Sequence, residues 1–128
     1  MILTFSKEQF KNKIQAGIKI HTIREDKANR WRMGKLIQHW LHNPRNVSKH
    51  PHQFGENSCT GTQSITISWT EFMFQKKPYV FIDDVKLTPD QVERLAINDG
   101  FESSKSFFAW FKDDIENWKI IHWTDFRY

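Results

Sequence analysis

The sequence predicts an α+β fold in which about three short helices flank a mostly antiparallel sheet of about six strands. Alternating β-branched and aromatic residues dominate the middle of the chain, as in half-buried strands. Helical spacing of apolar residues is confined to short segments near the two ends. The length of 128 residues suits one domain, so residues 1–128 are predicted to form a single domain with a small curled sheet or β-barrel.

The N-terminal part is predicted to form a strand, a helix and a second strand. Residues 2–5 are apolar, and Ser6 begins a capping-box pattern that favours a helix over about residues 7–16. Gly17 suits the position that follows the last helical residue. Residues 18–24 are rich in β-branched types and alternate in polarity, which predicts a strand.

The middle of the chain is predicted to be mostly strand, with one long loop. Residues 25–34 are polar and predict a loop or short turn, and residues 35–41 predict a strand. Pro, Gly, Asn and His punctuate residues 43–58, which predicts a loop longer than compact domains usually contain. Further strands are expected at residues 60–74, as one long strand or two, and at residues 79–82, with a turn at residues 76–78 between them.

The C-terminal part predicts two helices and a closing strand. Thr88 begins a capping box in front of a helix with proline at its first position, and Gly100 ends that helix. An aromatic helix is expected to begin at Ser103 or Ser104, and residues 118–123 predict the final strand.

Charge is unevenly distributed along the chain. Residues 1–64 contain 11 Lys and Arg against 4 Asp and Glu, a net charge of +7, whereas residues 65–128 contain 8 against 11, a net charge of −3. Such asymmetry indicates an anionic partner for the first half. A polarised surface without a function is the alternative.

Several classes of protein lose support. Cys59 is the single cysteine, which excludes an internal disulfide and favours a reducing, cytoplasmic location. No apolar run is long enough to span a membrane and the N-terminus lacks a signal-peptide pattern, so we expect no membrane partner. Phosphate-loop, dinucleotide and serine-hydrolase motifs are absent, and the spacing of the histidines predicts no metal site, so no cofactor is expected.

The stretch Ala16-Gly17-Ile18-Lys19-Ile20-His21-Thr22-Ile23-Arg24 resembles the corresponding element of the ASCH domain, a member of the PUA-like superfamily. The resemblance continues through Gly34 before a strand, the acidic-Gly-Phe turn at Asp99-Gly100-Phe101 and the closing strand Ile120-Ile121-His122-Trp123. It covers nearly the whole chain in order. The resemblance implies a PUA-like β-barrel and a partner that is RNA or a modified nucleoside.

One branch of that family, the N4-acetylcytidine amidohydrolases, cleaves the acetyl amide of a modified nucleoside with a Lys, a Thr and a carboxylate. The resemblance implies that Lys19 matches the Lys, Thr22 the Thr, and Asp99 the carboxylate, which is Glu in that branch. Arg24 matches an accompanying Arg.

The chemistry of these residues sets conditions on such a site. Lys19 can act as a base for the Thr22 hydroxyl only if its pKa falls well below the usual value of about 10.4. Residues three apart on a regular strand point to opposite faces, so a shared site needs a bulge, or Lys19 in the turn before the strand. Gly17 favours the turn. The alternative is a solvated Lys19, with Thr22 and Arg24 on one packed face.

Basic residues interleaved with an aromatic residue follow this element, a pattern typical of surfaces that contact phosphates and stack on bases. The candidate ligand- or nucleic-acid-binding residues are Arg24, Lys27, Arg30, Trp31, Arg32, Lys35 and Arg45. A core position for Trp31 within a solvated rim of charges is the alternative. We expect RNA or modified-nucleoside binding in a basic cleft, with an amidohydrolase that uses Lys19, Thr22 and Asp99 as the alternative and ribonuclease-like activity as a second alternative.

Overall fold

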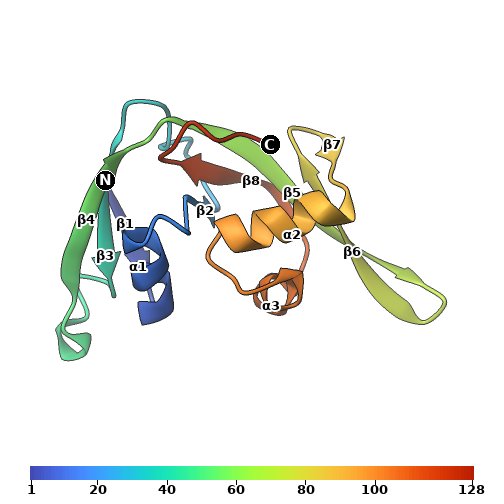
Figure 1. The fold of residues 1–128 in the computed structure, drawn as a ribbon, viewed down its shortest axis with the longest axis horizontal. Helices are drawn as coiled ribbons and strands as arrows, with labels where there is room; N and C mark the ends of the chain where they lie inside the picture. The colour runs from blue at the N-terminus through green and yellow to red at the C-terminus, as the bar shows by residue number, and fades with distance from the viewer.

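The computed structural model describes residues 1–128 and shows a mixed α+β fold with three helices and eight strands in two sheets (Figure 1). The strands are β1 (Ile2–Phe5), β2 (His21–Arg24), β3 (Leu36–Leu41), β4 (His52–Ser58), β5 (Gly61–Phe72), β6 (Gln75–Ile82), β7 (Val85–Lys86) and β8 (Ile115–His122). The helices are α1 (Glu8–Gln15), α2 (Pro89–Asn98) and α3 (Ser104–Trp110), with a short 3₁₀ turn, η1 (Val47–Lys49). The α+β class is confirmed, whereas strand pairing does not close the two sheets into a barrel.

The larger sheet has the strand order β2-β8-β5-β6-β7 and is antiparallel throughout. Its central strand β5 buries Gln63, Ile65 and Ile67, every second residue, so one face of this strand points to the core. In Figure 1, α2 and α3 lie together on one side of this sheet.

The smaller sheet has the order β1-β3-β4 and lies at the other end of the molecule, beside α1 (Figure 1). β1 pairs with β3 in parallel and β4 pairs with β3 in antiparallel orientation. The prediction of a loop throughout residues 43–58 is therefore wrong for residues 52–58, which form β4. This strand is polar and mostly exposed at a sheet edge, and backbone pairing rather than apolar alternation defines it.

The turn between β5 and β6 also differs from the prediction. Residues 76–78 lie inside β6, and the reversal occurs at Met73 and Phe74, both with positive φ. Pro78 is tolerated within β6 because β7 pairs only with Phe81 and Ile82 and leaves that edge of β6 free beside the proline.

Local capping signals define two of the three helices as predicted. Thr88 caps α2: its hydroxyl accepts from the Gln91 backbone amide at 3.3 Å, and its own amide donates to the Gln91 side chain at 2.8 Å. At α3 the Ser103 backbone amide donates to the Ser106 hydroxyl at 3.2 Å, the reciprocal half of such a box. The predicted cap at Ser6 is wrong, because Lys7 occupies the cap position of α1 without a side-chain hydrogen bond.

A single cluster of buried apolar side chains joins both sheets and the helices. Ile37 comes from the smaller sheet, Ile65 and Ile120 from the larger one, and Phe107 from α3, and all four are fully buried. The junction between the sheets is therefore packed and can hold side chains in fixed positions. None of the helices combines the length and the hydropathy needed to cross a membrane.

Candidate functional site

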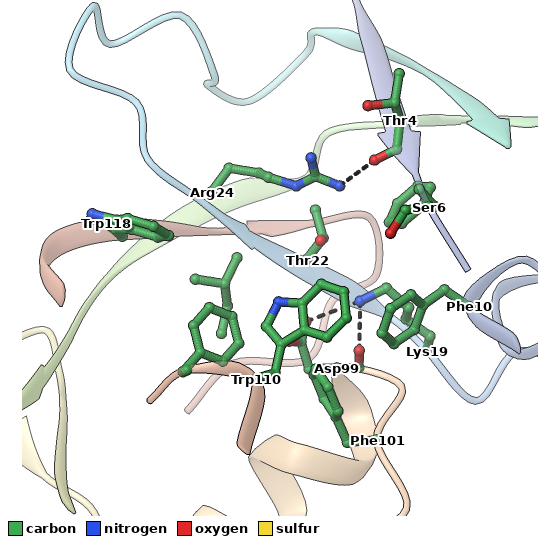
Figure 2. A pocket seen from close by; sticks show the side chains of 13 residues that line it. Thr4, Ser6, Phe10, Lys19, Thr22, Arg24, Asp99, Phe101, Trp110 and Trp118 are labelled. Atoms are coloured by element: carbon green, nitrogen blue, oxygen red, sulfur yellow. Dashed lines mark hydrogen bonds and ion pairs between the residues drawn. The ribbon is translucent and has the colours of Figure 1, made fainter. Parts of the chain in front are cut away.

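A cavity of about 370 Å³ lies where β1, β2, the end of α2 and the region of α3 meet. Lys19, Thr22, Arg24 and Asp99, all predicted from the sequence, line it together (Figure 2). Its volume falls in the range of about 300–1,000 Å³ that small-molecule sites occupy. The remaining walls are largely aromatic and come from Phe5, Phe10, Phe101, Trp110, Phe111 and Trp118.

A tight turn brings Lys19 to the same side as Thr22. The predicted strand begins at residue 18, whereas β2 begins at His21. Lys19 therefore lies before the strand. The backbone amides of Ile18 and Lys19 both donate to the Lys13 carbonyl, at 2.9 and 3.1 Å, and Gly17 has a φ of +75°. The turn, rather than a bulge, thus removes the opposite-face conflict between Lys19 and Thr22.

Lys19 and Asp99 form a buried ion pair at the floor of the cavity. The Lys19 ammonium donates to the Asp99 carbonyl at 2.6 Å and to Asp99 Oδ1 at 3.0 Å, and the two residues are 3% and 2% exposed. Gly100 has a φ of +94°, and a Cβ atom there would lie 2.9 Å from Cδ of Lys19. Glycine at position 100 therefore gives Lys19 the space to reach Asp99.

Burial changes the protonation chemistry of Lys19. Loss of hydration lowers the pKa of Lys19 from its usual 10.5, while the charge of Asp99 and the hydrogen bond to it oppose that shift. The ammonium also lies 5.2 Å from the ring centre of Phe10 and 5.7 Å from that of Phe5. A lysine in this state can release its proton more readily than a solvated one, as a general base requires.

A second row of buried polar residues holds Asp99 from behind. His21 Nδ1 lies 3.3 Å from Asp99 Oδ1, and His21 Nε2 lies 2.5 Å from the Tyr128 hydroxyl. The Asn98 amide donates to the same hydroxyl at 3.1 Å. Burial lowers the pKa of His21, so the neutral ring donates from Nδ1 to Asp99 and accepts at Nε2 from Tyr128.

Sequence reasoning missed His21, Asn98 and Tyr128. Alternation along residues 18–24 places His21 on the face opposite Thr22 and gives no reason to link it to Asp99. Tyr128 is 107 residues from His21 in the chain, so only the fold brings the two together. The predicted contact of Asp99 with Lys19 is a reason to look for a histidine near Asp99. No spacing in the sequence identifies His21 as that histidine.

Arg24 is a cation of the cavity without an acidic partner. Its guanidinium donates to the Thr4 carbonyl at 2.6 Å and lies 5.2 Å from the ring centre of Phe5. None of the ion pairs of the structure includes Arg24. Burial lowers the pKa of Arg24, but a guanidinium stays charged at neutral pH. Its other N–H groups are available to an oxygen atom of a ligand.

The other predicted binding residues lie outside the cavity. Their exposed members are Lys27, Arg30, Arg32, Lys35 and Arg45. Trp31 is only 6% exposed and packs in the core, as in the alternative interpretation, so its ring offers no stacking surface. Trp110, 48% exposed, and Trp118 provide aromatic walls of the cavity instead.

Hydrogen bonds to a single carboxylate fix the basic loop at residues 25–34. Asp26 accepts from the backbone amides of Arg30 and Trp31, each at 2.9 Å, and from the Lys119 ammonium at 2.9 Å. Burial raises the pKa of Asp26, but these bonds and the Lys119 charge together outweigh it and lower that pKa. The loop therefore presents Arg30 and Arg32 from a defined backbone.

No group of three or more His, Cys, Asp or Glu side chains comes together in a way that could hold a metal ion. His39 is buried and lies 3.0 Å from the Asn57 amide, whereas His42 lies in the loop that follows β3.

Burial raises the pKa of Cys59, which disfavours the reactive thiolate.

Comparison of the chain with protein-family models, with curated proteins and with solved structures finds no match. A function therefore has to be inferred from the chemistry of the cavity.

Proposed function

We propose that the chain is a hydrolase that removes an acyl group from the exocyclic amide of a nucleobase, for which N4-acetylcytidine is the example suggested by the resemblance to ASCH domains. One observation carries the proposal. Lys19, a buried lysine with a lowered pKa, lines the same cavity as Thr22 and is held in place by Asp99. A nucleophile, a base and a group that orients the base are the components that acyl transfer needs.

In the proposed reaction, neutral Lys19 accepts the proton of the Thr22 hydroxyl while that oxygen attacks the acyl carbonyl carbon. The C–N bond then breaks, and the exocyclic nitrogen takes a proton from the Lys19 ammonium and leaves as the free amine. Water, deprotonated by Lys19, attacks the acyl ester, and the Thr22 oxygen regains its proton as the carboxylic acid leaves.

Other residues of the cavity support this sequence of steps. Asp99 fixes the Lys19 amine, and His21 fixes Asp99. The free N–H groups of Arg24 can stabilise the negative charge that develops on the carbonyl oxygen. The rings of Phe10 and Trp110, whose centres are 5.5 Å apart, provide apolar surface for a planar base.

Incubation of the protein with N4-acetylcytidine tests the proposal, with release of cytidine followed by chromatography. Lys19→Gln and Thr22→Val are each expected to lower the rate at least ~100-fold, because each removes a group that takes part in proton transfer or bond formation. Lys112→Gln, an exposed residue outside the cavity, is the matched control and should keep the wild-type rate. An inactive wild type, or a Lys19→Gln variant as active as wild type, would contradict the proposal.

RNA binding is a second candidate function, favoured by the fixed basic loop. Arg30, Arg32 and Lys35 are exposed and form no ion pair, so their charges are available to phosphates. The ribonuclease-like alternative has no comparable support, because no histidine lines the cavity.

A further inference from the structure

A second cavity adjoins the candidate active site. It has a volume of about 230 Å³, and Thr4, Phe5 and Ser6 line both cavities. Its other walls are His42, Asn43, Asn46 and Lys49, which belong to the segment between β3 and β4. Part of the long loop predicted at residues 43–58 thus lies beside the proposed reaction centre.

Hydrogen-bond donors dominate this second cavity. The side-chain oxygen of Asn43 accepts from the Arg45 amide at 2.9 Å, and that of Asn46 accepts from the Ser48 hydroxyl at 2.8 Å. These bonds engage the oxygens within the loop and leave both amide NH₂ groups without a protein partner. The Lys49 ammonium forms no ion pair. No carboxylate lines the cavity, so its chemistry suits an anion.

Arg24 marks the boundary between the two cavities. It lines the first cavity and donates to the carbonyl of Thr4, which lines both. Across the two cavities, the cations Lys19, Arg24 and Lys49 face a single carboxylate, Asp99. The charges of Lys19 and Asp99 cancel within their ion pair, so Arg24 and Lys49 leave an excess of positive charge that suits a phosphate group.

We propose that the second cavity binds the phosphate group of a nucleotide whose acylated base occupies the first cavity. This inference rests on the proposed function and makes it more specific: the substrate is a phosphorylated nucleoside rather than a free one. Lys49 supplies the charge, Asn43 and Asn46 supply N–H donors, and Arg24 contacts the ligand between phosphate and base.

Calorimetric titrations with cytidine, cytidine 5′-monophosphate, cytidine 3′-monophosphate and inorganic phosphate test this site. We expect one monophosphate to bind at least about tenfold more tightly than cytidine. Lys49→Gln should remove most of that difference without changing the affinity for cytidine, and Lys49→Arg should restore it. Lys76→Gln, an exposed lysine of β6 that lines neither cavity, removes the same charge and should behave as wild type.

The outcomes separate this inference from the proposed function. Equal affinity for cytidine and both monophosphates, or a preference that survives Lys49→Gln, overturns the phosphate site while leaving deacylation of the free nucleoside intact. Binding of inorganic phosphate that Lys49→Gln abolishes and Lys76→Gln does not would support the phosphate site even if N4-acetylcytidine is not hydrolysed. Absence of both phosphate binding and a monophosphate preference overturns it.

Discussion

At the scale of single residues, three fully buried histidines tie the stability of the fold to pH. His21, His39 and His122 are each 0% exposed. Burial lowers the pKa of His39 to about 4 and that of His122 to about 3, with smaller contributions from the charge of Lys19 on His39 and that of Arg127 on His122. Nε2 of His122 donates to the Gln63 side-chain oxygen, so an added proton would sit on Nδ1, which is buried without an acceptor. Nε2 of His39 accepts from the Asn57 amide, so a proton added there would face another donor.

We expect stability to fall as the pH drops from 7 to 5. In the unfolded chain His39 and His122 titrate near 6.5, whereas in the folded chain both stay neutral at pH 5, so the unfolded state binds more protons across this range. Their contribution is complete above pH 6.5 and is lost below it, by about 2 kcal/mol per histidine between pH 7 and pH 5. Urea titrations at the two pH values measure the loss.

His39→Phe is the informative variant for this prediction. Phenylalanine retains the stacking on Phe54, whose ring centre lies 5.8 Å from that of His39, and cannot bind a proton. The drop in unfolding free energy between pH 7 and pH 5 should shrink by about 2 kcal/mol in this variant. An unchanged drop would show that His39 is protonated in the folded protein.

The position of Lys19 and Thr22 beside one cavity could be predicted from the sequence, because the cause is local. Lys19 and Thr22 belong to one short motif, and the glycine before them allowed the turn that the structure contains. The network behind them was not predictable, because the contact between His21 and Tyr128 depends on the full course of the chain. Trp31 shows that a local pattern can also mislead. Its basic neighbours resemble a binding surface, but its own ring is in the core.

At the scale of secondary-structure elements, the β5–β6 hairpin has an unfavourable turn. Met73 and Phe74 have φ values of +50° and +64°, a conformation that two-residue hairpins usually assign to Asn and Gly. Phe74 is 99% exposed and Met73 is 79% exposed, so neither side chain gains packing energy in return. The turn therefore lowers the stability of the hairpin.

The double variant Met73→Asn/Phe74→Gly should raise the free energy of unfolding by about 1–2 kcal/mol, because it relieves this backbone strain. The urea midpoint at pH 7 measures the change. Asp84→Gly provides a comparison at the β6–β7 turn, where φ is +65° but Asp already suits the conformation, so a smaller gain is expected there. A double variant no more stable than wild type would mean that the turn costs nothing.

Helices and strands could likewise be predicted where local sequence determines them, and not where distant parts of the chain do. The capping box at Thr88 is encoded within four residues and was found. β4 was missed because its polar sequence carries no alternation and its pairing with β3 supplies the strand. The turn at Met73 was missed because its residues are atypical of turns, whereas Lys76, Lys77 and Pro78 mimic one.

At the scale of the whole molecule, the arrangement of the two sheets could not be predicted. The register of β2 with β8 joins residues about 100 positions apart, and no local pattern specifies such a pairing. The sequence alone predicted a small curled sheet or barrel, and the structure shows two sheets around one core. The uneven charge, by contrast, was visible in the sequence, and the structure places exposed cations of the first half on a fixed loop.

This charge distribution leads to a prediction about RNA binding. It distinguishes the effect of where the positive charges lie from the effect of the net charge of the protein. If Arg30, Arg32 and Lys35 contact phosphates, binding of single-stranded RNA should weaken with salt, and changing all three to Gln should reduce the slope of log affinity against log salt by about 2. A second triple variant, with Gln at Lys76, Lys77 and Lys105, likewise lowers the net charge from +4 to +1 and should leave the slope nearly unchanged. Fluorescence anisotropy at a series of salt concentrations provides both slopes. Equal reductions in the two triple variants would assign RNA association to net charge alone, because specific phosphate contacts depend on position and a diffuse field does not.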